Sequence, residues 1–390
     1  MKILGIETSC DETSIALLEA TEPGPRFSVI SHITLSQIKM HEQYGGVFPN
    51  VAQREHQKNL VPLLLEVLRE AGENSDGKTA SAGDVKKIVN ILDREPILLE
   101  AFLHLLSHRP IPHIDAIAVT HGPGLEPALW TGVNFAKALS TVWGVPVIPV
   151  NHMEGHIVSV LLPEKGKEAM VPSDVKFPAL ALLVSGGHTE LVLMEKWGAY
   201  KRLGETRDDA VGEAFDKVAR MLLLPYPGGP QISRLAEEER KLSPKVKKTF
   251  TFPRPMMHSK DYDFSFAGLK TAVLYTIKKL PEVTEQIRRE ITREFEDSVV
   301  EVLVSKTARA IEEFEPRTLI IGGGVSANTH LRKECVALKS KFPELEVFIP
   351  TLGASGDNAA MIAIAGYLDS NARKNKVSLG SIKAQGNLRL

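Results

Sequence analysis

The sequence predicts an α/β protein built from two halves that repeat one plan. Residues 3–19, an apolar run interrupted by SCDET, and residues 180–195, LALLVSGGHTELVLME, each have the pattern of two buried strands joined by a tight polar turn. Between and after these hairpins, apolar strands alternate with segments of helical periodicity, which is typical of α/β folds. Because the hairpin plan occurs near the start and again near the middle, we expect duplicated lobes over residues 1–175 and 176–390.

Composition narrows the class of protein. The 390 residues exceed the usual size of a single hydrophobic core, which agrees with two lobes. The chain has 47 basic and 48 acidic residues, so its net charge argues neither for nor against nucleic-acid binding. Its most basic segment, KLSPKVKKTFTFPR at 241–254, is interpreted as a solvated loop or a local nucleic-acid contact.

Cysteine usage and hydropathy indicate where the protein works. Cys10 and Cys335 lie far apart and form no metal-binding or disulfide pattern. No apolar run reaches the length of a membrane span, and the start of the chain lacks the basic and apolar regions of a signal peptide. We therefore expect a cytoplasmic protein that makes no membrane contact.

Both halves divide into predictable elements. An amphipathic helix is expected at about 51–71, and the break THGPGL separates a strand from a helix that ends at Gly144. The segment PVIPVNH predicts a buried strand that runs into a helix from Asn151. The second half is expected to add the strand TLIIGG, a last helix at about 357–370 that lies near the cleft between the lobes, and helices at about 210–223, 230–242 and 283–314.

An insertion is predicted at 73–109. It begins with a loop-like stretch and continues with two helix-length segments around Pro96. We interpret it as a helical hairpin packed on the first lobe; a partner-docking surface is the alternative.

The segment NHMEGH is a candidate metal site. His152 and His156 are four residues apart, so on a helix both imidazoles project from one face and can share a metal ion. Peptide-cleaving HExxH helices have glutamate directly after the first histidine, whereas here that residue is Met153 and Glu154 comes one later. Two histidines leave coordination open, so a carboxylate is expected from elsewhere. Asp357, at the start of the last helix, is the candidate, and it could equally be the N-cap of that helix.

The two hairpin tips are candidate phosphate-binding turns. The first contains Asp11 and Glu12, and the second contains Gly186 and Gly187. Small residues at such tips let backbone N–H groups approach phosphate oxygens. Plain hairpin turns are the alternative for either tip alone, but two matched tips favour phosphate binding.

Three further segments carry candidate nucleotide contacts. IIGGGVSAN runs from a buried strand through a glycine turn into a helix with Asn328 in its first turn. GEAFDKVAR offers Asp216, which by itself could be a solvated helix carboxylate, and YPGGP places Gly229 before the next helix. A single glycine turn is a weak signal.

Eight motifs in order resemble one family. IETSCDET, THGPGL, NHMEGH, LLVSGGHT, GEAFDK, YPGGP, GGGVSAN and GDNAAM are similar to those of the TsaD family of tRNA threonylcarbamoyltransferases, and the similarity covers nearly the whole chain outside 73–109. The resemblance implies a two-lobed actin-like, sugar-kinase-like ATPase (ASKHA) fold around a nucleotide cleft. It also implies transfer of a threonylcarbamoyl group from its adenylate to N6 of the adenosine on the 3′ side of the anticodon, in tRNAs that read codons beginning with A.

The resemblance also implies roles for individual residues. The metal ligands would be His152, His156 and Asp357, holding one divalent ion, Fe²⁺ or alternatively Zn²⁺. Asp11 or Glu12 would accept the amine proton or position the tRNA adenosine. The adenine nucleotide is threonylcarbamoyl-AMP, or ATP or ADP with Mg²⁺, and its expected contacts are Leu183, Val184, Ser185, Gly186, Gly187, Asp216, Gly229 and Asn328.

Partners follow from the same resemblance. Bacterial members of the family work on tRNA in a complex with TsaB-like and TsaE-like proteins, and a separate synthase supplies threonylcarbamoyl-AMP. Three other functions remain open at the level of the residues. A small-molecule kinase would share the phosphate tips but needs no HxxxH pair, a metallopeptidase disagrees with the position of Glu154, and a non-catalytic scaffold needs none of the polar residues.

Overall fold

The chain forms two compact units in a computed structural model that describes residues 1–390 except 23, 74–80, 107–111, 164–169, 244–248 and 370–376. Unit 1 consists of Met1–His41, Val47–Asp174 and Gly356–Leu390. Unit 2 consists of Glu42–Gly46 and Val175–Ser355. Among the described residues, the structure contains no helix with the length and apolar character needed to cross a bilayer.

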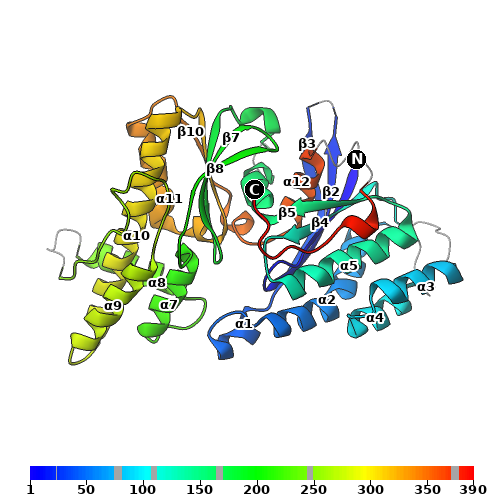
Figure 1. Ribbon diagram of the computed structural model, residues 1–390, viewed down its shortest axis with the longest axis horizontal. Coiled ribbons are helices and arrows are strands. Elements are labelled where there is room, and N and C mark those ends of the chain that lie inside the picture. The colour runs from blue at the N-terminus through cyan, green and yellow to red at the C-terminus, as the bar shows by residue number, and fades with distance from the viewer. Residues whose placement is uncertain (23, 74–80, 107–111, 164–169, 244–248, 370–376) are drawn as a thin grey trace. The chain divides into compact units, whose positions relative to one another are not determined.

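Unit 1 is built on a five-stranded sheet with the order β3-β2-β1-β4-β5 (Figure 1). The first three strands form an antiparallel meander, and β4 and β5 continue the sheet in parallel with β1. The strands are β1 Lys2–Glu7, β2 Glu12–Thr21, β3 Arg26–Ser36, β4 Ala116–Gly122 and β5 Val147–Asn151.

Helices cover both faces of this sheet. Leu4 and Ile6 of β1 point to one face, where they join the core with α2 and α5. Gly5 points to the other face, where an added Cβ would lie 2.1 Å from the carbonyl oxygen of Ala359 in α12. The helices of the unit are α1 Ile38–His41, α2 Pro49–Glu70, α3 Ala82–Ile91, α4 Pro96–Leu106, α5 Glu126–Trp143, α6 His152–Val158 and α12 Ala359–Leu368.

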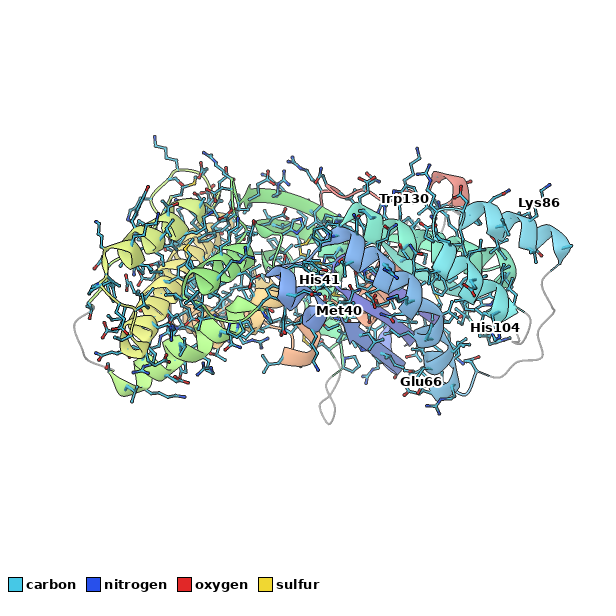
Figure 2. The ribbon with its side chains drawn as sticks, turned by 90° about the horizontal axis from the view of Figure 1, so that it is seen from below. Met40, His41, Glu66, Lys86, His104 and Trp130 are labelled. Atoms are coloured by element: carbon cyan, nitrogen blue, oxygen red, sulfur yellow. The ribbon has the colours of Figure 1, made fainter. Side chains whose placement is uncertain are left out.

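The predicted insertion forms α3 and α4, which Lys86 and His104 mark in Figure 2. Its residues 74–80 and 107–109 lie outside the described part of the chain. Pro96 is the first residue of α4, a position where proline costs no helical hydrogen bond. Ile88, Leu98 and Phe102 are buried in the same core as α2 and α5, so the insertion packs on unit 1 through an apolar face.

Unit 2 repeats the strand order of unit 1. Its sheet has the order β10-β9-β6-β7-β8, with β6, β7 and β8 antiparallel and β9 and β10 parallel to β6. The same arrangement in both sheets confirms the predicted duplication and the α/β fold class. The elements are β6 Ala179–Val184, β7 Thr189–Lys196, β8 Ala199–Glu205, α7 Val211–Met221, α8 Gly228–Leu242, α9 Ala267–Lys279, α10 Glu285–Phe314, β9 Thr318–Gly322, α11 Thr329–Ala337 and β10 Glu346–Phe348.

The last part of the chain differs from the sequence-based boundary at 175/176. Gly356–Leu390 groups with unit 1, whereas that boundary leaves these residues in the second lobe. The cause is α12, whose residues are buried on nearly every side and therefore need a sheet face to pack against. Ala359 and Ala360 meet Ala16 of β2 and provide that contact.

Candidate metal centre and nucleotide pocket

Helix α6 presents the two candidate histidines side by side. It begins directly after β5, and Asn151 caps it by accepting a hydrogen bond from the backbone N–H of Met153 at 2.8 Å. His152 and His156 lie one turn apart, with ring centroids separated by 4.6 Å. Both side chains are buried, so their ring nitrogens are shielded from water.

Asp357, which is far from the histidines in sequence, lies beside both imidazole rings. Its Oδ1 lies 3.4 Å from His152 Nε2 and 3.2 Å from His156 Nε2. The alternative that Asp357 caps the last helix is wrong, because Asn358 is the N-cap and accepts from the N–H of Met361 at 2.9 Å. The carboxylate of Asp357 therefore lies beside the histidines instead of capping the helix.

Gly155 allows α6 and α12 to approach closely enough for this meeting. An added Cβ at Gly155 would lie 2.8 Å from Ile362 Cδ1 and 3.0 Å from Met361 Cγ. Because Gly155 lies between the two histidines in sequence, its lack of a side chain brings α12, and with it Asp357, against the histidine-bearing helix.

The donor set fits a divalent metal ion. One ligand atom from each of His152, His156 and Asp357 lies within 4.8 Å of the others, and no other such group of three occurs among the described residues. Two ligands on one tetrahedral ion are about 3.4 Å apart, given metal–ligand bonds of about 2.0–2.2 Å. His156 Nδ1 is buried without a hydrogen-bond partner, and Nε2 has Asp357 Oδ1 at 3.2 Å but makes no well-aligned hydrogen bond with it, so a metal ion at Nε2 would satisfy that nitrogen. Three protein ligands leave further positions open for a substrate atom.

The charged groups at this centre strongly shift one another's pKa values. Burial alone would lower the pKa of His152, but Asp357 and Glu7 together raise it well above its ordinary value. Burial would likewise raise the pKa of Asp357, yet the two histidines hold it well below its usual range. The centre therefore stabilises positive charge among its ligands, as a cation site requires.

Glu7 is a residue that the sequence analysis did not single out. Its carboxylate lies on the far side of His152, with Oε2 3.0 Å from Nδ1. Burial favours its neutral form, but the neighbouring His152 lowers the pKa of Glu7 below its ordinary value. A glutamate within the apolar run ILGIE is the only sequence signal for this contact.

The first hairpin tip places its acidic residues near the metal cluster. Burial, and then the charge of Asp357, raises the pKa of Asp11. Burial, Asp11 and Asp357 raise the pKa of Glu12 well above its ordinary value, and Glu12 also accepts a hydrogen bond from Ser36 Oγ at 3.2 Å. Burial raises the pKa of Cys10 far enough that its thiol stays protonated near neutral pH, so it is not a nucleophile candidate.

The second hairpin tip borders a cavity of about 300 Å³ within unit 2. Four of the eight nucleotide candidates line it, namely Gly186, Asp216, Gly229 and Asn328. The structure does not bring the other four to the cavity wall. Leu183 and Val184 have fully buried side chains, and Ser185 is engaged within the turn, where its N–H donates to the carbonyl oxygen of His188 at 2.9 Å.

Asn328 is held by its surroundings. Its Nδ2 donates to Ser233 Oγ at 2.7 Å and to Glu296 Oε1 at 2.6 Å, and its Oδ1 caps α11 by accepting from the N–H of Leu331 at 2.8 Å. The nitrogen of Asn328 is thus committed to the protein, and Ser233 is a further polar residue on the cavity wall that the sequence analysis missed.

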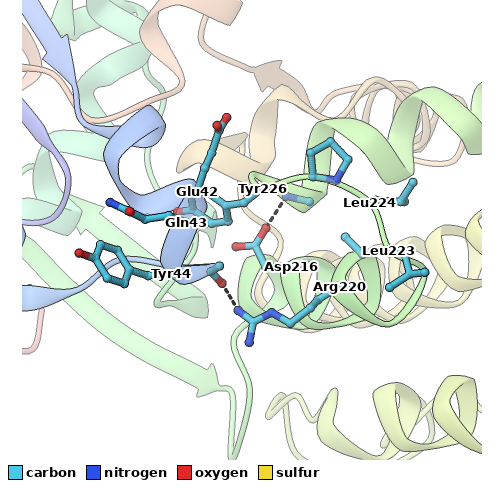
Figure 3. Close-up of a pocket in the computed structure, with 12 residues that line it drawn as sticks. Glu42, Gln43, Tyr44, Asp216, Arg220, Leu223, Leu224 and Tyr226 are labelled. Carbon is cyan, nitrogen blue, oxygen red and sulfur yellow. Dashed lines mark hydrogen bonds between the residues drawn. The ribbon is translucent and has the colours of Figure 1, made fainter.

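Asp216 also lines a second cavity of about 600 Å³ in unit 2, which Figure 3 shows. The Oδ1 of Asp216 accepts a hydrogen bond from the N–H of Gly228 at 2.7 Å, which fixes the turn between α7 and α8. Across the larger cavity, the guanidinium of Arg220 donates to the carbonyl oxygen of Gly45. Asp216 is therefore a structural part of the cavity wall and not a freely solvated helix carboxylate.

The basic segment at 241–254 has two basic residues in the described part of the chain, Lys241 and Arg254. Lys241 is exposed on α8 and lies 3.4 Å from Glu237. Lys245, Lys247 and Lys248 lie outside the described residues. Arg254 pairs with Glu294 and Glu301, so its charge is already balanced within unit 2.

Comparison with known proteins adds an independent observation. The sequence profile of the TsaD family, described as tRNA N6-adenosine threonylcarbamoyltransferase, matches residues 28–77 and 99–364. The unmatched stretch between these parts contains α3 of the insertion. A protein of this description from Ralstonia pickettii (strain 12J) is 45% identical over 384 residues, which cover 97% of this chain and 94% of the relative. Another, from Neisseria gonorrhoeae (strain ATCC 700825 / FA 1090), is 42% identical over 385 residues, covering 94% of this chain and 93% of the relative.

Solved structures of HypF share the fold. HypF of T. kodakarensis superimposes with a TM-score of 0.51 at 14% identity, over 94% of this chain and 47% of HypF. Full-length HypF in a phosphate- and nucleotide-bound form gives 0.50 at 12% identity, over 97% of this chain and 47% of HypF. The chain thus spans about half the length of these proteins. Identity this low shows a common fold alone, which agrees with the predicted ASKHA-like type.

The matches to the family cover most of the chain. The matched profile residues make up most of the chain, and the relatives at 42–45% identity cover nearly all of it. The chain therefore belongs to the TsaD family of tRNA N6-adenosine threonylcarbamoyltransferases.

Proposed function

We propose that the protein transfers the threonylcarbamoyl group of threonylcarbamoyl-AMP to N6 of the adenosine on the 3′ side of the anticodon. The acceptors are tRNAs that read codons beginning with adenine, and the product is threonylcarbamoyladenosine (t6A). The observation that carries the proposal is the His152, His156 and Asp357 cluster, in a chain whose relatives are tRNA N6-adenosine threonylcarbamoyltransferases.

The cavity in unit 2 is the proposed binding site for the adenosine of the donor. Its volume is at the lower end of the range for small-molecule sites, which suits one nucleoside. Gly186 and Gly229 expose backbone at its wall, while Phe215 and Val325 supply apolar surface for a base. Ser233 is the polar side chain that we expect to contact the sugar.

The cluster in unit 1 is the proposed metal centre. His152, His156 and Asp357 would hold one divalent ion, Fe²⁺ by preference or Zn²⁺, since imidazole and carboxylate ligands suit both. When bound, such an ion supplies Lewis acidity toward an oxygen of the donor. The residues themselves contribute rigidity, because both histidines are buried on one helix and Asp357 is fixed by the adjoining α12.

Acyl transfer also requires a proton acceptor. The N6 amine forms a bond to the carbamoyl carbon, the bond from that carbon to the phosphate oxygen breaks, and AMP leaves with its electron pair. One N6 proton must then pass to a base. Asp11 or Glu12 is proposed for this role, or for positioning the tRNA adenosine. Both lie at the first hairpin tip, and burial, together with the charge of Asp357, raises the pKa of each.

The proposed setting is a cytoplasmic complex. TsaB-like and TsaE-like proteins are the proposed partners, tRNA is the acceptor, and a separate synthase delivers threonylcarbamoyl-AMP. The names of the relatives described above support tRNA as the acceptor, and the other components are proposed from the resemblance to the family.

A reconstituted reaction tests the proposal. The full chain, threonylcarbamoyl-AMP, tRNA and the two candidate partners are combined, and t6A is measured in digested tRNA. We expect product that depends on the chain and on a divalent ion. No product with any partner set, or product from a chain lacking the three ligands, would refute the proposal.

A further inference from the structure

A buried glutamate lies directly behind the candidate metal centre. Glu7 is the last residue of β1 and is completely buried. The last residue of β6, which occupies the corresponding place in unit 2, is the equally buried Val184. Burying a carboxylate is costly unless hydrogen bonds and charges compensate it. Unit 2 has valine at this place. The glutamate of unit 1 must therefore be stabilised by groups around it.

Three groups hold the carboxylate of Glu7. The N–H of Ser9 donates to Oε1 at 2.5 Å, and the Thr120 hydroxyl donates to Oε2 at 2.6 Å. His152 Nδ1 lies 3.0 Å from the same Oε2. With donors on both oxygens, the carboxylate acts as an acceptor, so the Nδ1 of His152 carries the hydrogen of this contact.

This hydrogen bond selects the metal-binding form of His152. A neutral imidazole with its proton on Nδ1 keeps a lone pair on Nε2. The Nε2 of His152 is the atom that lies 3.4 Å from Asp357 Oδ1, on the side of the ring where the three ligand atoms meet. Glu7 therefore orients the lone pair of His152 toward the place of the ion.

The two histidines differ in this respect. His156 Nδ1 is buried and has no hydrogen-bond partner, whereas His152 Nδ1 has Glu7 at 3.0 Å and Ser9 Oγ at 3.3 Å. The support is thus specific to one ligand and is not a general feature of the helix.

We propose that Glu7 is a positioning residue, which fixes the ring orientation and tautomer of His152 for metal binding. The inference rests on the metal centre proposed above. A ligating histidine commonly donates its second ring N–H to a carboxylate, and loss of that partner weakens metal binding about 10–100-fold.

The substitution Glu7→Gln tests the proposal with little change of shape. Its amide oxygen must face the N–H of Ser9, so its NH₂ group points toward Thr120 and His152. That NH₂ donates to Nδ1 and moves the ring proton to Nε2, where it blocks metal binding. Binding of Co²⁺ and Zn²⁺ to the full chain is measured by equilibrium dialysis, and the visible spectrum of bound Co²⁺ reports the ligand geometry. We expect affinity about 10–100-fold weaker than that of the unchanged chain.

Two further variants separate positioning from simple loss of fold. Thr120→Val removes one donor to Glu7 but keeps the carboxylate, so a smaller loss of affinity and a changed Co²⁺ spectrum are expected. Glu95→Gln alters another buried carboxylate of unit 1, which accepts from Asn134 at 3.2 Å, and should leave metal affinity unchanged. Circular dichroism and urea unfolding of each full-length variant check that it is folded.

The outcomes are distinct. Equal metal affinity in Glu7→Gln and the unchanged chain overturns the inference, and so does an unchanged chain that binds neither ion. If Glu7→Gln fails to fold, an unchanged affinity and spectrum in Thr120→Val overturn it instead. A chain that binds metal in a Glu7-dependent way but forms no t6A with any partner set contradicts the proposed function and supports this inference.

Discussion

The two hairpin tips share a backbone plan and differ in chemistry. Residues 8–11 join β1 to β2, and residues 185–188 join β6 to β7, at the same place in two sheets of one strand order. The first tip carries Asp11, which is 8% exposed, whereas the second carries the exposed Gly186 and Gly187. The acidic tip offers charge and the glycine tip offers backbone N–H groups and space. One duplicated hairpin therefore supports two different tasks.

The difference continues into the neighbouring strands. In unit 1, Glu7 and Thr120 of β4 are joined by a side-chain hydrogen bond of 2.6 Å. In unit 2, Val184 packs instead against Gly323, which follows β9 and where an added Cβ would lie 2.3 Å from the Val184 carbonyl oxygen. Unit 1 thus supports its tip with a polar network, while unit 2 supports its tip with close backbone packing.

Removal of a metal ligand should have the largest effect. In His156→Ala the ion loses one of three protein ligands, so metal content and t6A formation are both expected to fall to background. Metal content is measured by elemental analysis and product by digestion of the tRNA. ADP binding should stay unchanged, because its proposed site lies in unit 2. Full transfer by a metal-free variant would show that the acidic tip works without an ion.

The substitution Asp11→Ala tests whether the first tip takes part in the transfer reaction. If Asp11 accepts the proton, transfer should fall about 10²–10⁴-fold while the affinity for threonylcarbamoyl-AMP stays largely intact. Single-turnover rates and donor binding are measured separately, with Glu12→Gln as the matched variant that tells which carboxylate acts. A loss of donor affinity comparable to the loss of rate would assign Asp11 to binding instead.

The packing beneath the second tip can be tested with two glycines. Gly323 has φ of +91° and no room for a Cβ, so Gly323→Ala should destabilise the protein by about 1–3 kcal/mol from backbone strain alone, with a further cost from the clash. Gly186→Ala meets no atom within 4 Å and should cost much less. Urea unfolding gives both free energies. Equal values would mean that close packing against Val184 does not distinguish this tip.

Much of the fold could be predicted because its signals are local. The two hairpins, α2, α5 and α10 follow from apolar periodicity and from breaks such as Gly144, which caps α5 in a left-handed conformation. Helix α9 was missed, since only Leu269 and Val273 are buried in it and its apolar stripe is weak. The membership of Gly356–Leu390 in unit 1 depends on long-range packing, which no local pattern encodes.

The part of the site that lies on one helix could be predicted from residue spacing. His152 and His156 follow from four-residue spacing, but Asp357 required a motif that lies far away in sequence. Its alternative as an N-cap could not be excluded locally, because Asn358 beside it is an equally good cap. Glu7 escaped notice because a single glutamate at the end of an apolar strand does not reveal which histidine it faces.

Acid should have a moderate effect, and it concerns how the first tip is held. His56 of α2 donates from Nε2 to the carbonyl oxygen of Cys10 at 3.0 Å, and its Nδ1 accepts from Thr13 Oγ1 at 2.8 Å, so it binds the tip as a neutral ring. Burial lowers the pKa of His56 to about 4, against 6.5 for an unperturbed histidine. Between these values the unfolded chain binds more protons than the folded chain, so stability is retained above pH 6.5 and lost as the pH falls toward 4.

The linkage gives a loss of about 2 kcal/mol from this group between pH 7 and pH 5. Urea unfolding of the full chain at the two pH values should show it, and His56→Gln should reduce the pH dependence by about that amount because glutamine does not titrate. In the second tip the N–H of Ser185 donates to the carbonyl oxygen of His188 at 2.9 Å, and the N–H of His188 donates to Ser185 Oγ at 3.1 Å, so the prediction concerns the first tip. An unchanged pH dependence in His56→Gln would show that neutral His56 does not hold the acidic tip.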